Sequence, residues 1–206
     1  IPSYAFYGFK GVTEIVLPES ITSIGNYAFY NCSSMTNANL TSKLVSIGAS
    51  AYSGCSSSKL SSVKFPSSLT SIGTEAFCGC TGLTSIEVPG TVKTIGNYAF
   101  ENCTGLKSAV IKDGVGSLGS YIFNKCTALE ELTLPYAGTS LATTNNATSS
   151  GYMSGILFRS NVEGKMYYDG YAWYIPNSLK KITITGGTRI PSYAFYGFKG
   201  VTEIVL

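Results

Sequence analysis

The chain has 206 residues, 12% of them charged, and a formal net charge of +3 at pH 7. Average globular domains carry about 25% charged residues, and the lysines here are scattered, so a nucleic-acid interface is not expected. No apolar run approaches the ~18 residues of a membrane span, so we expect no membrane insertion by this chain. The chain has no histidine, which removes the commonest general base and the Ser-His and Cys-His pairs. We therefore expect no enzymatic activity, no catalytic residue and no cofactor.

One phrase, Ile-Gly-x-x-Ala-Phe-x-x-Cys, recurs with small changes along most of the chain. Its copies begin at Ile1, Ile24, Ile47, Ile72, Ile95, Leu118 and Ile190. The first six copies are separated by 23, 23, 25, 23 and 23 residues. A fixed short period is typical of a solenoid in which every repeat forms one coil.

The intervals between the copies contain pairs of apolar residues two positions apart. The pairs are Ile15/Leu17, Ala38/Leu40, Val63/Phe65, Ile86/Val88, Ala109/Ile111, Leu132/Leu134, Ile182/Ile184 and Ile204/Leu206. Such alternation predicts a short strand with one buried and one solvated face. A proline directly follows several pairs, for example Pro89 after Val88, and its missing N–H ends the strand. We expect one such strand in every coil.

The phrase itself predicts a turn. In the second copy, Ala28, Phe29 and Cys32 lie at positions i, i+1 and i+4, which form one apolar side of a helical or 3₁₀ turn. Gly25 indicates a tight bend before them, and Pro2 at the same place in the first copy indicates a φ that is negative. A full crossover helix is excluded, because such a unit needs about 30 residues or more.

One repeat shows the complete pattern: Leu83-x-x-Ile86-x-Val88-Pro89-x-x-Val92-x-x-Ile95-Gly-x-x-Ala99-Phe100-x-x-Cys103. It resembles the BspA-type leucine-rich repeat, a 23-residue class found in large surface proteins of bacteria and some protozoa, and the resemblance covers residues 1–135 and 179–206. It implies an α+β repeat solenoid, a right-handed leucine-rich-repeat coil with short parallel strands on one face and short helical or 3₁₀ turns on the other. It also implies adhesion, or binding of host or matrix proteins, at the cell surface or outside the cell, as part of a longer protein.

Residues 136–178 interrupt the pattern and are expected to form an insertion, after which residues 179–206 continue the solenoid of residues 1–135. Residues 138–151 are polar and low in complexity, as in an irregular loop. The remainder suggests short strands joined by turns, which predicts a small β-meander. It contains the aromatic cluster Tyr167, Tyr168, Tyr171, Trp173 and Tyr174. These rings either close the meander against the solenoid or bind a glycan or protein.

Five cysteines occupy one position of the repeat and are expected to stack as a structural ladder. They are Cys32, Cys55, Cys80, Cys103 and Cys126. Phe9 and Phe198 fill the same position in the terminal copies, so it is a core position, and buried free thiols are favoured over disulfides or a metal site. Cys78 follows Phe77, outside this position, and is expected to be more exposed.

Residues 190–206 are identical to residues 1–17, even at exposed positions such as Lys10/Lys199 and Glu14/Glu203. Neighbouring coils share only their buried positions, so we interpret this identity as a recent tandem duplication with a period of 189 residues, the offset from Ile1 to Ile190. The hypothesis that follows is a longer protein in which this whole unit repeats.

A second candidate surface is the concave face of the strands, where the residues between the buried pairs line up. They are Val16, Asn39, Lys64, Glu87, Val110, Thr133, Thr183 and Val205. The row mixes charged and apolar groups, which favours a protein partner over a polyanion, and Lys64 and Glu87 are its candidate binding residues. We expect a non-enzymatic interaction module that binds a protein or glycan, with a purely structural spacer as the alternative.

Overall fold

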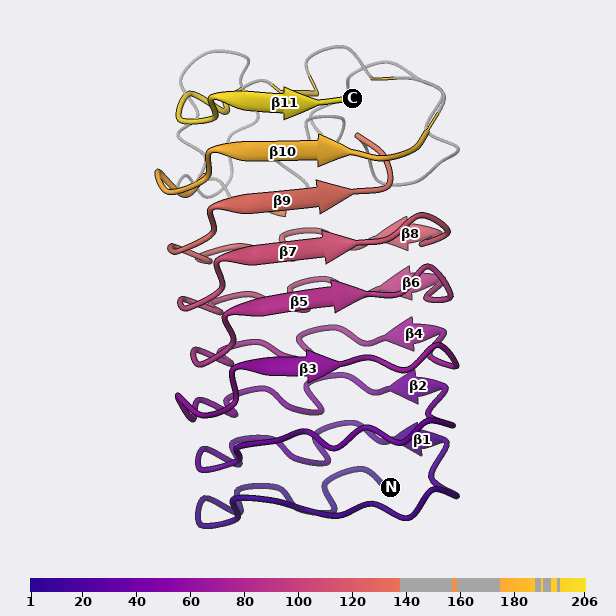
Figure 1. Cartoon of the computed structure of the whole chain (residues 1–206). Helices are drawn as coiled ribbons and strands as arrows, with labels where there is room; N and C mark the ends of the chain where they lie inside the picture. The colour runs from indigo at the N-terminus through magenta and orange to yellow at the C-terminus, as the bar shows by residue number, and fades with distance from the viewer. Residues whose placement is uncertain (138–156, 159–174, 188–189, 191–193, 196) are drawn as a thin grey trace, which may run out of the picture.

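The computed structural model describes residues 1–137, 157–158, 175–187, 190, 194–195 and 197–206, which form a column of stacked coils (Figure 1). Apart from Leu157, which has a helical backbone, the regular elements of these residues are strands. Their bounds are β1 (Ser23–Ile24), β2 (Ser46–Ile47), β3 (Ser62–Lys64), β4 (Ser71–Ile72), β5 (Ser85–Val88), β6 (Thr94–Ile95), β7 (Ser108–Ile111), β8 (Ser117–Leu118), β9 (Glu131–Leu134), β10 (Lys181–Ile184) and β11 (Glu203–Val205). They form a six-stranded and a five-stranded sheet.

The larger sheet contains strands that the alternating pairs predict. Its order is β11-β10-β9-β7-β5-β3, and all neighbours are parallel. Ile86 pairs with Ala109 and Ala109 pairs with Leu132, so the buried residues of successive coils stack in register. Exposed and buried residues alternate along β5, and Ile86 and Val88 face the core. The prediction of a solenoid with short parallel strands is therefore confirmed.

The prediction of a strand at the alternating pair is wrong for the first coil (residues 1–17) and the second coil (residues 18–40). Neither Ile15/Leu17 nor Ala38/Leu40 belongs to a strand. The φ angle of Asn39 is 45°, in the left-handed region, and this takes the second coil out of the extended conformation. The corresponding segment of the first coil then has no extended neighbour with which to form a ladder.

The smaller sheet was not predicted from the alternating pairs. Its order is β1-β2-β4-β6-β8, again with parallel neighbours. Each strand consists of the first apolar residue of the phrase and the Ser or Thr before it, as in Ser23–Ile24. The apolar residue is buried in every one of these strands. Each of the coils that contribute to both sheets is therefore held to its neighbours on two sides of the column.

The prediction of helical or 3₁₀ turns, and with it the α+β class, is wrong for the described coils, where the phrase forms turns without a helix. The amides of Tyr27, Phe29 and Asn31 donate to carbonyls of the next coil at N···O distances of 2.7–2.9 Å, so they cannot bond within a helix. The φ angles of Tyr27 and Asn31 are 56° and 59°, which a right-handed helix does not allow. The fold is a parallel-strand β-solenoid.

The glycine of the phrase allows successive coils to approach closely. A Cβ atom built on Gly96 would lie 2.3 Å from the backbone nitrogen of Thr74 in the preceding coil, and Gly25, Gly48, Gly73 and Gly119 would meet similar contacts. None of these glycines has a positive φ, as Pro2 indicates at the equivalent place in the first coil. Their requirement is therefore space rather than backbone conformation.

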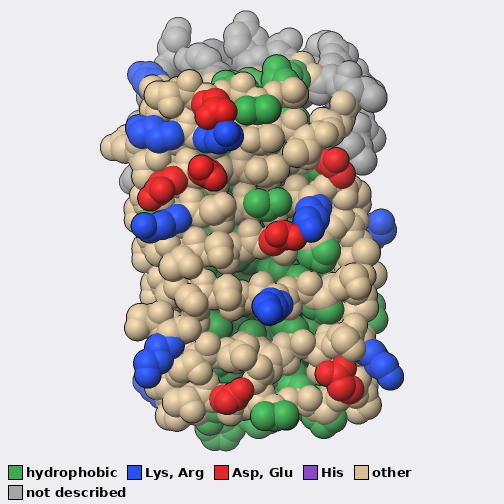
Figure 2. Space-filling view, in the orientation of Figure 1, with side chains coloured by type: hydrophobic (Ala, Val, Ile, Leu, Met, Phe, Trp, Pro, Cys, Tyr) green, Lys and Arg blue, Asp and Glu red, His purple; other side chains and the backbone are tan. Residues whose placement is uncertain are grey.

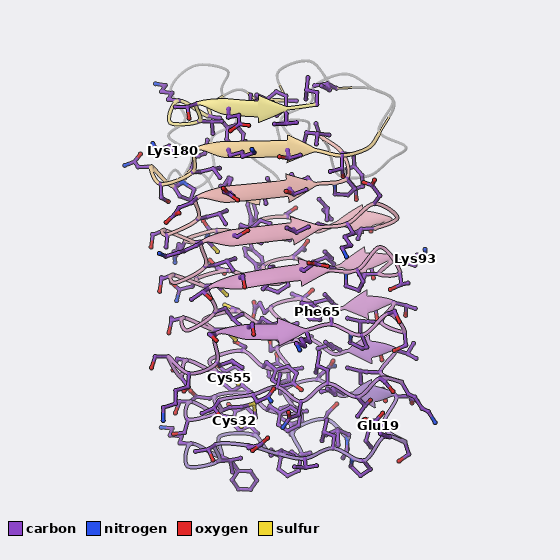
Figure 3. All side chains as sticks on the ribbon, viewed as in Figure 1. Glu19, Cys32, Cys55, Phe65, Lys93 and Lys180 are labelled. Carbon is purple, nitrogen blue, oxygen red and sulfur yellow. The ribbon has the colours of Figure 1, made fainter. Side chains whose placement is uncertain are left out.

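Two columns of side chains run along the core among its stacked aliphatic residues. One is a stack of rings whose successive centroids are 5.0–5.9 Å apart: Phe6, Phe29, Tyr52, Phe77, Phe100 and Phe123. The other is the cysteine ladder, whose five thiols are buried and free. Each thiol donates to the backbone carbonyl of the aromatic residue in the preceding coil, with Sγ···O distances of 3.1–3.2 Å. Figure 3 labels Cys32 and Cys55 in adjacent coils.

The β-meander and aromatic cluster predicted between residues 136 and 178 lie largely outside the described residues, and the division into 1–135, 136–178 and 179–206 stays a prediction. What the structure shows is that β10 pairs directly with β9, with Lys181 opposite Glu131 and Ile184 opposite Leu134. The sheet therefore continues from one strand to the other despite the long stretch of sequence between them.

Candidate functional site

The outer face of the larger sheet brings most of the predicted row together. In register across the strands, the row is Lys64, Glu87, Val110, Thr133, Thr183 and Val205. None of these residues is buried. Lys64 and Glu87, the two candidate binding residues, lie opposite each other on β3 and β5.

The two candidate charges differ in their surroundings. The Glu87 carboxylate forms an ion pair with the Lys112 ammonium group of the next coil, and both side chains are more than half exposed. Lys64 forms no ion pair within the described part of the chain. Figure 2 shows basic (blue) and acidic (red) side chains scattered over this face of the column without a stripe of one sign. Glu87 therefore already has an ion-pair partner, whereas Lys64 has none among the described residues.

The larger sheet stops at β3, and two features of the sequence cause this. The first is the left-handed backbone at Asn39. The second is the two additional residues in the third coil (residues 41–65), where eight positions separate Cys55 from Val63, against six between Cys80 and Ile86. The two additional residues lie in the segment that leads into β3. On this side β3 has no strand of the second coil with which to form the parallel hydrogen bonds that join the later coils.

Polar side chains hold the interrupted segment in place. Asn39 Nδ2 donates to Glu14 Oε1 at 2.9 Å and to the Ile15 carbonyl at 3.1 Å. The backbone N–H of Asn39 donates to Asn37 Oδ1 at 3.0 Å. These bonds replace the ladder bonds that a strand would form here, so the interruption has a defined geometry.

Tyr52 supports the same segment from inside the core. Its ring occupies the position that Phe holds in the other stacked coils, and its hydroxyl donates to the Ala38 carbonyl at 3.2 Å. Burial raises the pKa of Tyr52 well above its usual value, so the hydroxyl stays protonated and remains a donor. The Tyr52 hydroxyl thus satisfies the Ala38 carbonyl, which has no strand neighbour to bond.

A groove of about 360 Å³ lies at the interruption, between the second and third coils. It is lined by Thr36, Asn37, Ala38, Asn39, Leu40, Lys59, Ser61, Ser62 and Lys64. Lys59 and Lys64 are both exposed, and neither forms an ion pair with the described residues. The lining contains no carboxylate. Two ammonium groups beside hydroxyl and amide groups suit a ligand that carries negative charge and several oxygen atoms.

Cys78 is half-buried, whereas the ladder cysteines are fully buried. Burial, together with the nearby carboxylates of Glu101 and Glu75, raises the pKa of the Cys78 thiol to about 11. A thiol with so high a pKa is a poor nucleophile at neutral pH. Cys78 is therefore more accessible than the ladder without being activated.

The structure groups the predicted site residues differently from the sequence. Lys64 lies in the groove, whereas Glu87 lies beside it on β5 and is paired with Lys112. The aromatic cluster at 167–174 lies outside the described residues. Sequence reasoning missed Lys59 and the role of Asn39. The available signals were the spacing of 25 instead of 23 residues at this point and the single tyrosine in a column of phenylalanines.

The described residues contain no group of three or more His, Cys, Asp or Glu side chains that could hold a metal ion. The described part of the chain contains no helix long and apolar enough to cross a membrane.

Comparisons with solved structures find similarity to three leucine-rich repeat proteins. The chain is similar to a leucine-rich repeat protein of T. pallidum (TpLRR), with 34% identity and a TM-score of 0.61, over 64% of this chain and 61% of that chain. It is also similar to a leucine-rich repeat protein from Bacteroides ovatus ATCC 8483, with 23% identity and a TM-score of 0.36, over 99% of this chain and 63% of that chain. A third similar structure is a leucine rich cell surface protein from Faecalibacterium prausnitzii A2-165, with 18% identity and a TM-score of 0.39, over 100% of this chain and 82% of that chain.

The chain thus spans less than two thirds of the length of the first two of these proteins. Among curated proteins, none matches it. The family described as "BspA type Leucine rich repeat region" matches residues 1–60 and 55–164, with six copies of the repeat. Together with the parallel-strand solenoid, this match confirms the resemblance seen in the repeats, and the chain belongs to the BspA-type leucine-rich repeat family.

Proposed function

We propose that this chain is a non-enzymatic interaction module of a cell-surface or secreted protein, which mediates adhesion by binding a host protein or glycan. Its family and fold make it a binding or structural repeat module. The proposal adds the surface that binds, which is the groove beside β3, and the property that the ligand needs, which is negative charge.

The observation that carries the proposal is the supported interruption of the larger sheet. An uninterrupted ladder would present a flat row of alternating side chains. Here Asn39 and Tyr52 instead hold a groove of about 360 Å³ open between two coils. The scaffold around it is rigid, because the smaller sheet and the turns continue without interruption past the same coils. A preorganised polar groove binds without first ordering its own residues.

The test is binding of the chain to a panel of acidic glycans, neutral glycans and matrix proteins, for the native sequence and for a Lys59→Ala/Lys64→Ala variant. We expect an acidic ligand to bind, and the variant to weaken this binding by about tenfold or more, since two desolvated charge contacts are lost. Added salt should weaken binding to the native chain for the same reason. A variant that binds as tightly as the native chain would contradict the assignment of the groove.

The control is a Lys43→Ala/Lys93→Ala variant, which has the same net charge as the groove variant. Lys43 and Lys93 are exposed and lie outside the groove lining. Binding should therefore stay within about twofold of the native chain, because long-range charge alone contributes little at physiological salt. Equal losses in both variants would indicate a general charge effect in place of a site.

A Tyr171→Ala/Trp173→Ala variant tests the other predicted surface. Loss of binding only in this variant would place recognition on the insertion, as an adhesive aromatic cluster. The alternative function is a purely structural spacer, and the column of stacked coils with a mixed-charge face supports it equally well at the level of the fold. Absence of binding to every member of the panel would favour the spacer.

A further inference from the structure

One series of main-chain hydrogen bonds along the column is broken at the third coil. In the later coils, the amide of the residue just before the strand donates to the carbonyl of its equivalent in the preceding coil, at N···O distances of 2.8–2.9 Å. The donors are Thr84, Lys107, Glu130, Lys180 and Thr202. Thr36 donates in the same way to the Thr13 carbonyl at 2.7 Å. Ser61, the equivalent residue of the third coil, instead donates to the Lys59 carbonyl of its own loop at 2.9 Å.

The change at Ser61 leaves the carbonyl of Thr36 open. No described residue donates a main-chain hydrogen bond to this carbonyl, although its equivalents in the neighbouring coils accept one. The two additional residues of the third coil precede Ser61, so this loop is long enough to bond to itself. Thr36 lines the groove. Its carbonyl is therefore an acceptor for a hydroxyl or N–H group of a ligand.

The N–H group of Ser62 also lacks the partner that its equivalents have. Ser62 begins β3 and stacks in register with the first residues of the other strands of the larger sheet. In β7, β9, β10 and β11 the N–H of that residue donates to the preceding coil; the donors are Ser108, Glu131, Lys181 and Glu203. The Ser62 N–H therefore points toward the second coil, but it donates to no residue there. Because Ser62 lines the groove, this N–H is available to a ligand.

Positive charge lies beside these two main-chain groups. Lys59 and Lys64 line the groove, are exposed and have no ion-pair partner among the described residues. The other polar groups of the lining are hydroxyls and amides. A ligand oxyanion in the groove can therefore accept charge-assisted hydrogen bonds from the ammonium groups together with one from the Ser62 N–H.

An extended peptide does not fit the open edge of β3. Addition of a strand needs about 4.8 Å of free space beside the edge. The second coil already occupies this side, and the pairing of β1 with β2 joins it to the third coil (Figure 1). The amides of Tyr27, Phe29 and Asn31 join the same two coils at the turns. The coils therefore cannot move apart to admit a strand, and the bound part of a ligand has to be compact.

We propose that the groove recognises one acidic sugar unit, which carries a carboxylate or a sulfate group; this inference rests on the proposed function and names the class of its ligand. The anionic oxygens bind between Lys59 and Lys64 and accept from the Ser62 N–H. A hydroxyl of the same sugar donates to the Thr36 carbonyl. An inorganic anion or an isolated carboxylate satisfies the first set of groups but has no donor for this carbonyl.

The size and lining of the groove agree with one sugar unit. Its volume of about 360 Å³ lies near the lower end of the ~300–1,000 Å³ that is typical of small-ligand sites. Only Ala38 and Leu40 contribute apolar side chains to the lining, which suits a ring that carries many hydroxyl groups. A sugar ring also holds its anionic group and its hydroxyls in a fixed relation. It therefore loses less conformational entropy on binding than a flexible acidic peptide does.

Titrations followed by the NMR shifts of the backbone amides test the class of ligand. The probes are glucuronic acid, glucose 6-sulfate, glucose, sodium sulfate and the peptide acetyl-Gly-Glu-Gly-amide, all at one ionic strength. We expect at least one of the two acidic sugars to shift the Ser62 amide saturably. The amide of Ser108, which is already bonded to Thr84, should not shift. The acidic sugar that saturates at the lower concentration identifies the preferred anionic group.

The other probes separate the sugar from its charge. Glucose should leave the Ser62 amide unshifted, because it has no anionic group. Sodium sulfate and the peptide should require concentrations about fivefold or more higher than the acidic sugar, since one lacks the hydroxyl bond and the other lacks the fixed ring. Sodium sulfate that binds as tightly as the acidic sugars, or a peptide that binds more tightly, would overturn the proposal.

Two substitutions of Ser62 test its N–H group. Proline removes the N–H and is tolerated at the first residue of a strand where that N–H forms no ladder bond. Ser62→Pro should therefore weaken binding of the acidic sugar about fivefold or more. Ser62→Ala is the matched control, because it keeps the N–H and removes only the hydroxyl, and its affinity should stay within about twofold of the native chain. Native affinity in a folded Ser62→Pro chain would overturn the role of the N–H, and the Ser62 shift in the native chain decides the question if that variant does not fold.

Failure of this inference differs from failure of the proposed function. If a protein or peptide binds and the Lys59→Ala/Lys64→Ala variant loses that binding, while both acidic sugars leave the Ser62 amide unshifted, the binding function stands and the acidic sugar is wrong. If the lysine variant binds every ligand as tightly as the native chain does, the groove is not the site and both proposals are wrong.

Discussion

Each ladder cysteine donates a hydrogen bond to a buried backbone carbonyl of the preceding coil, which few side chains of its size can do. The Phe77 carbonyl accepts from the Cys80 amide of its own coil and from the Cys103 thiol of the next coil, both at 3.2 Å. A thiol is small and apolar enough for the core and still offers a weak donor to the second lone pair of a buried carbonyl.

Cys103→Ala should reduce the free energy of unfolding by about 1–2 kcal/mol, because it removes a buried sulfur and the donor to the Phe77 carbonyl. Urea unfolding followed by circular dichroism measures this change. Cys78→Ala is the comparison, since Cys78 is half-buried and outside the ladder. We expect its cost to be below about 0.5 kcal/mol, and equal costs for both variants would show that the ladder position has no special role.

At the scale of the coil, one kind of glycine is required for space between coils and another for a left-handed backbone conformation. A Cβ atom added at Gly96 would collide with the backbone of Thr74 in the preceding coil. Gly79 has a φ of 71° and no Cβ contact closer than 3.7 Å, and Asn102 and Lys125 hold its equivalent position in later coils, with φ angles of 57° and 59°. The first glycine sets the distance between coils, and the second permits a left-handed turn that Asn also adopts.

The same substitution should therefore change the free energy of unfolding much more at Gly96 than at Gly79. Gly96→Asn is expected to lower the free energy of unfolding by about 3 kcal/mol, since backbone atoms must move to admit a side chain. Gly79→Asn should change it by less than about 1 kcal/mol, since Asn tolerates the left-handed region. Thermal unfolding of the two variants under identical conditions measures the difference. A Gly96→Asn variant as stable as Gly79→Asn would refute the close approach between coils.

Over the whole molecule, the buried thiols and Tyr52 are groups that ionise only with difficulty. Burial raises the pKa of Cys55 and Cys126 to about 12, and it raises those of Cys80, Cys103 and Tyr52 well above their usual values. In the unfolded chain, cysteine ionises near pH ~8.5. Above that pH the unfolded state therefore binds fewer protons than the native state, and stability falls as the pH rises.

We expect the free energy of unfolding to be nearly constant from about pH 7 to about pH 8 and to fall at higher pH, by up to ~1.4 kcal/mol per pH unit for each buried thiol. Urea unfolding at a series of pH values, with excess reductant throughout, measures this slope. The Cys55→Ala/Cys126→Ala variant should show a shallower fall. A slope unchanged in that variant would mean that other groups cause the alkaline loss.

Much of the fold could be read from the sequence, because the core repeats at a fixed period. The apolar pairs of β5, β7, β9 and β10 and the cysteine position repeat wherever a residue must be buried in every coil. The turn could not be read correctly. The apolar residues of the phrase have the spacing of a helical face. The amides of Tyr27, Phe29 and Asn31 nevertheless bond to the next coil, and a local sequence pattern does not contain these bonds.

The candidate site was only partly accessible from the sequence. The row from Lys64 to Val205 follows from strand alternation, since equivalent positions of parallel strands stack. The groove does not follow, because it exists where the alternation fails at Asn39 and where the coil lengthens before Val63. Lys59 and Lys64 both lie in the third coil, but they line a groove only when residues 36–40 of the second coil stack beside them.

The sequence by itself determined the family, the period of the coils and the identity of their buried residues, since each buried position must be filled again in every repeat. Only the tertiary structure decided that the coils form two parallel sheets without helices and that the larger sheet is interrupted beside β3. The physical reason is that these features depend on hydrogen bonds and close contacts between residues more than twenty positions apart. Such bonds form between coils, and the properties of each coil alone do not specify them.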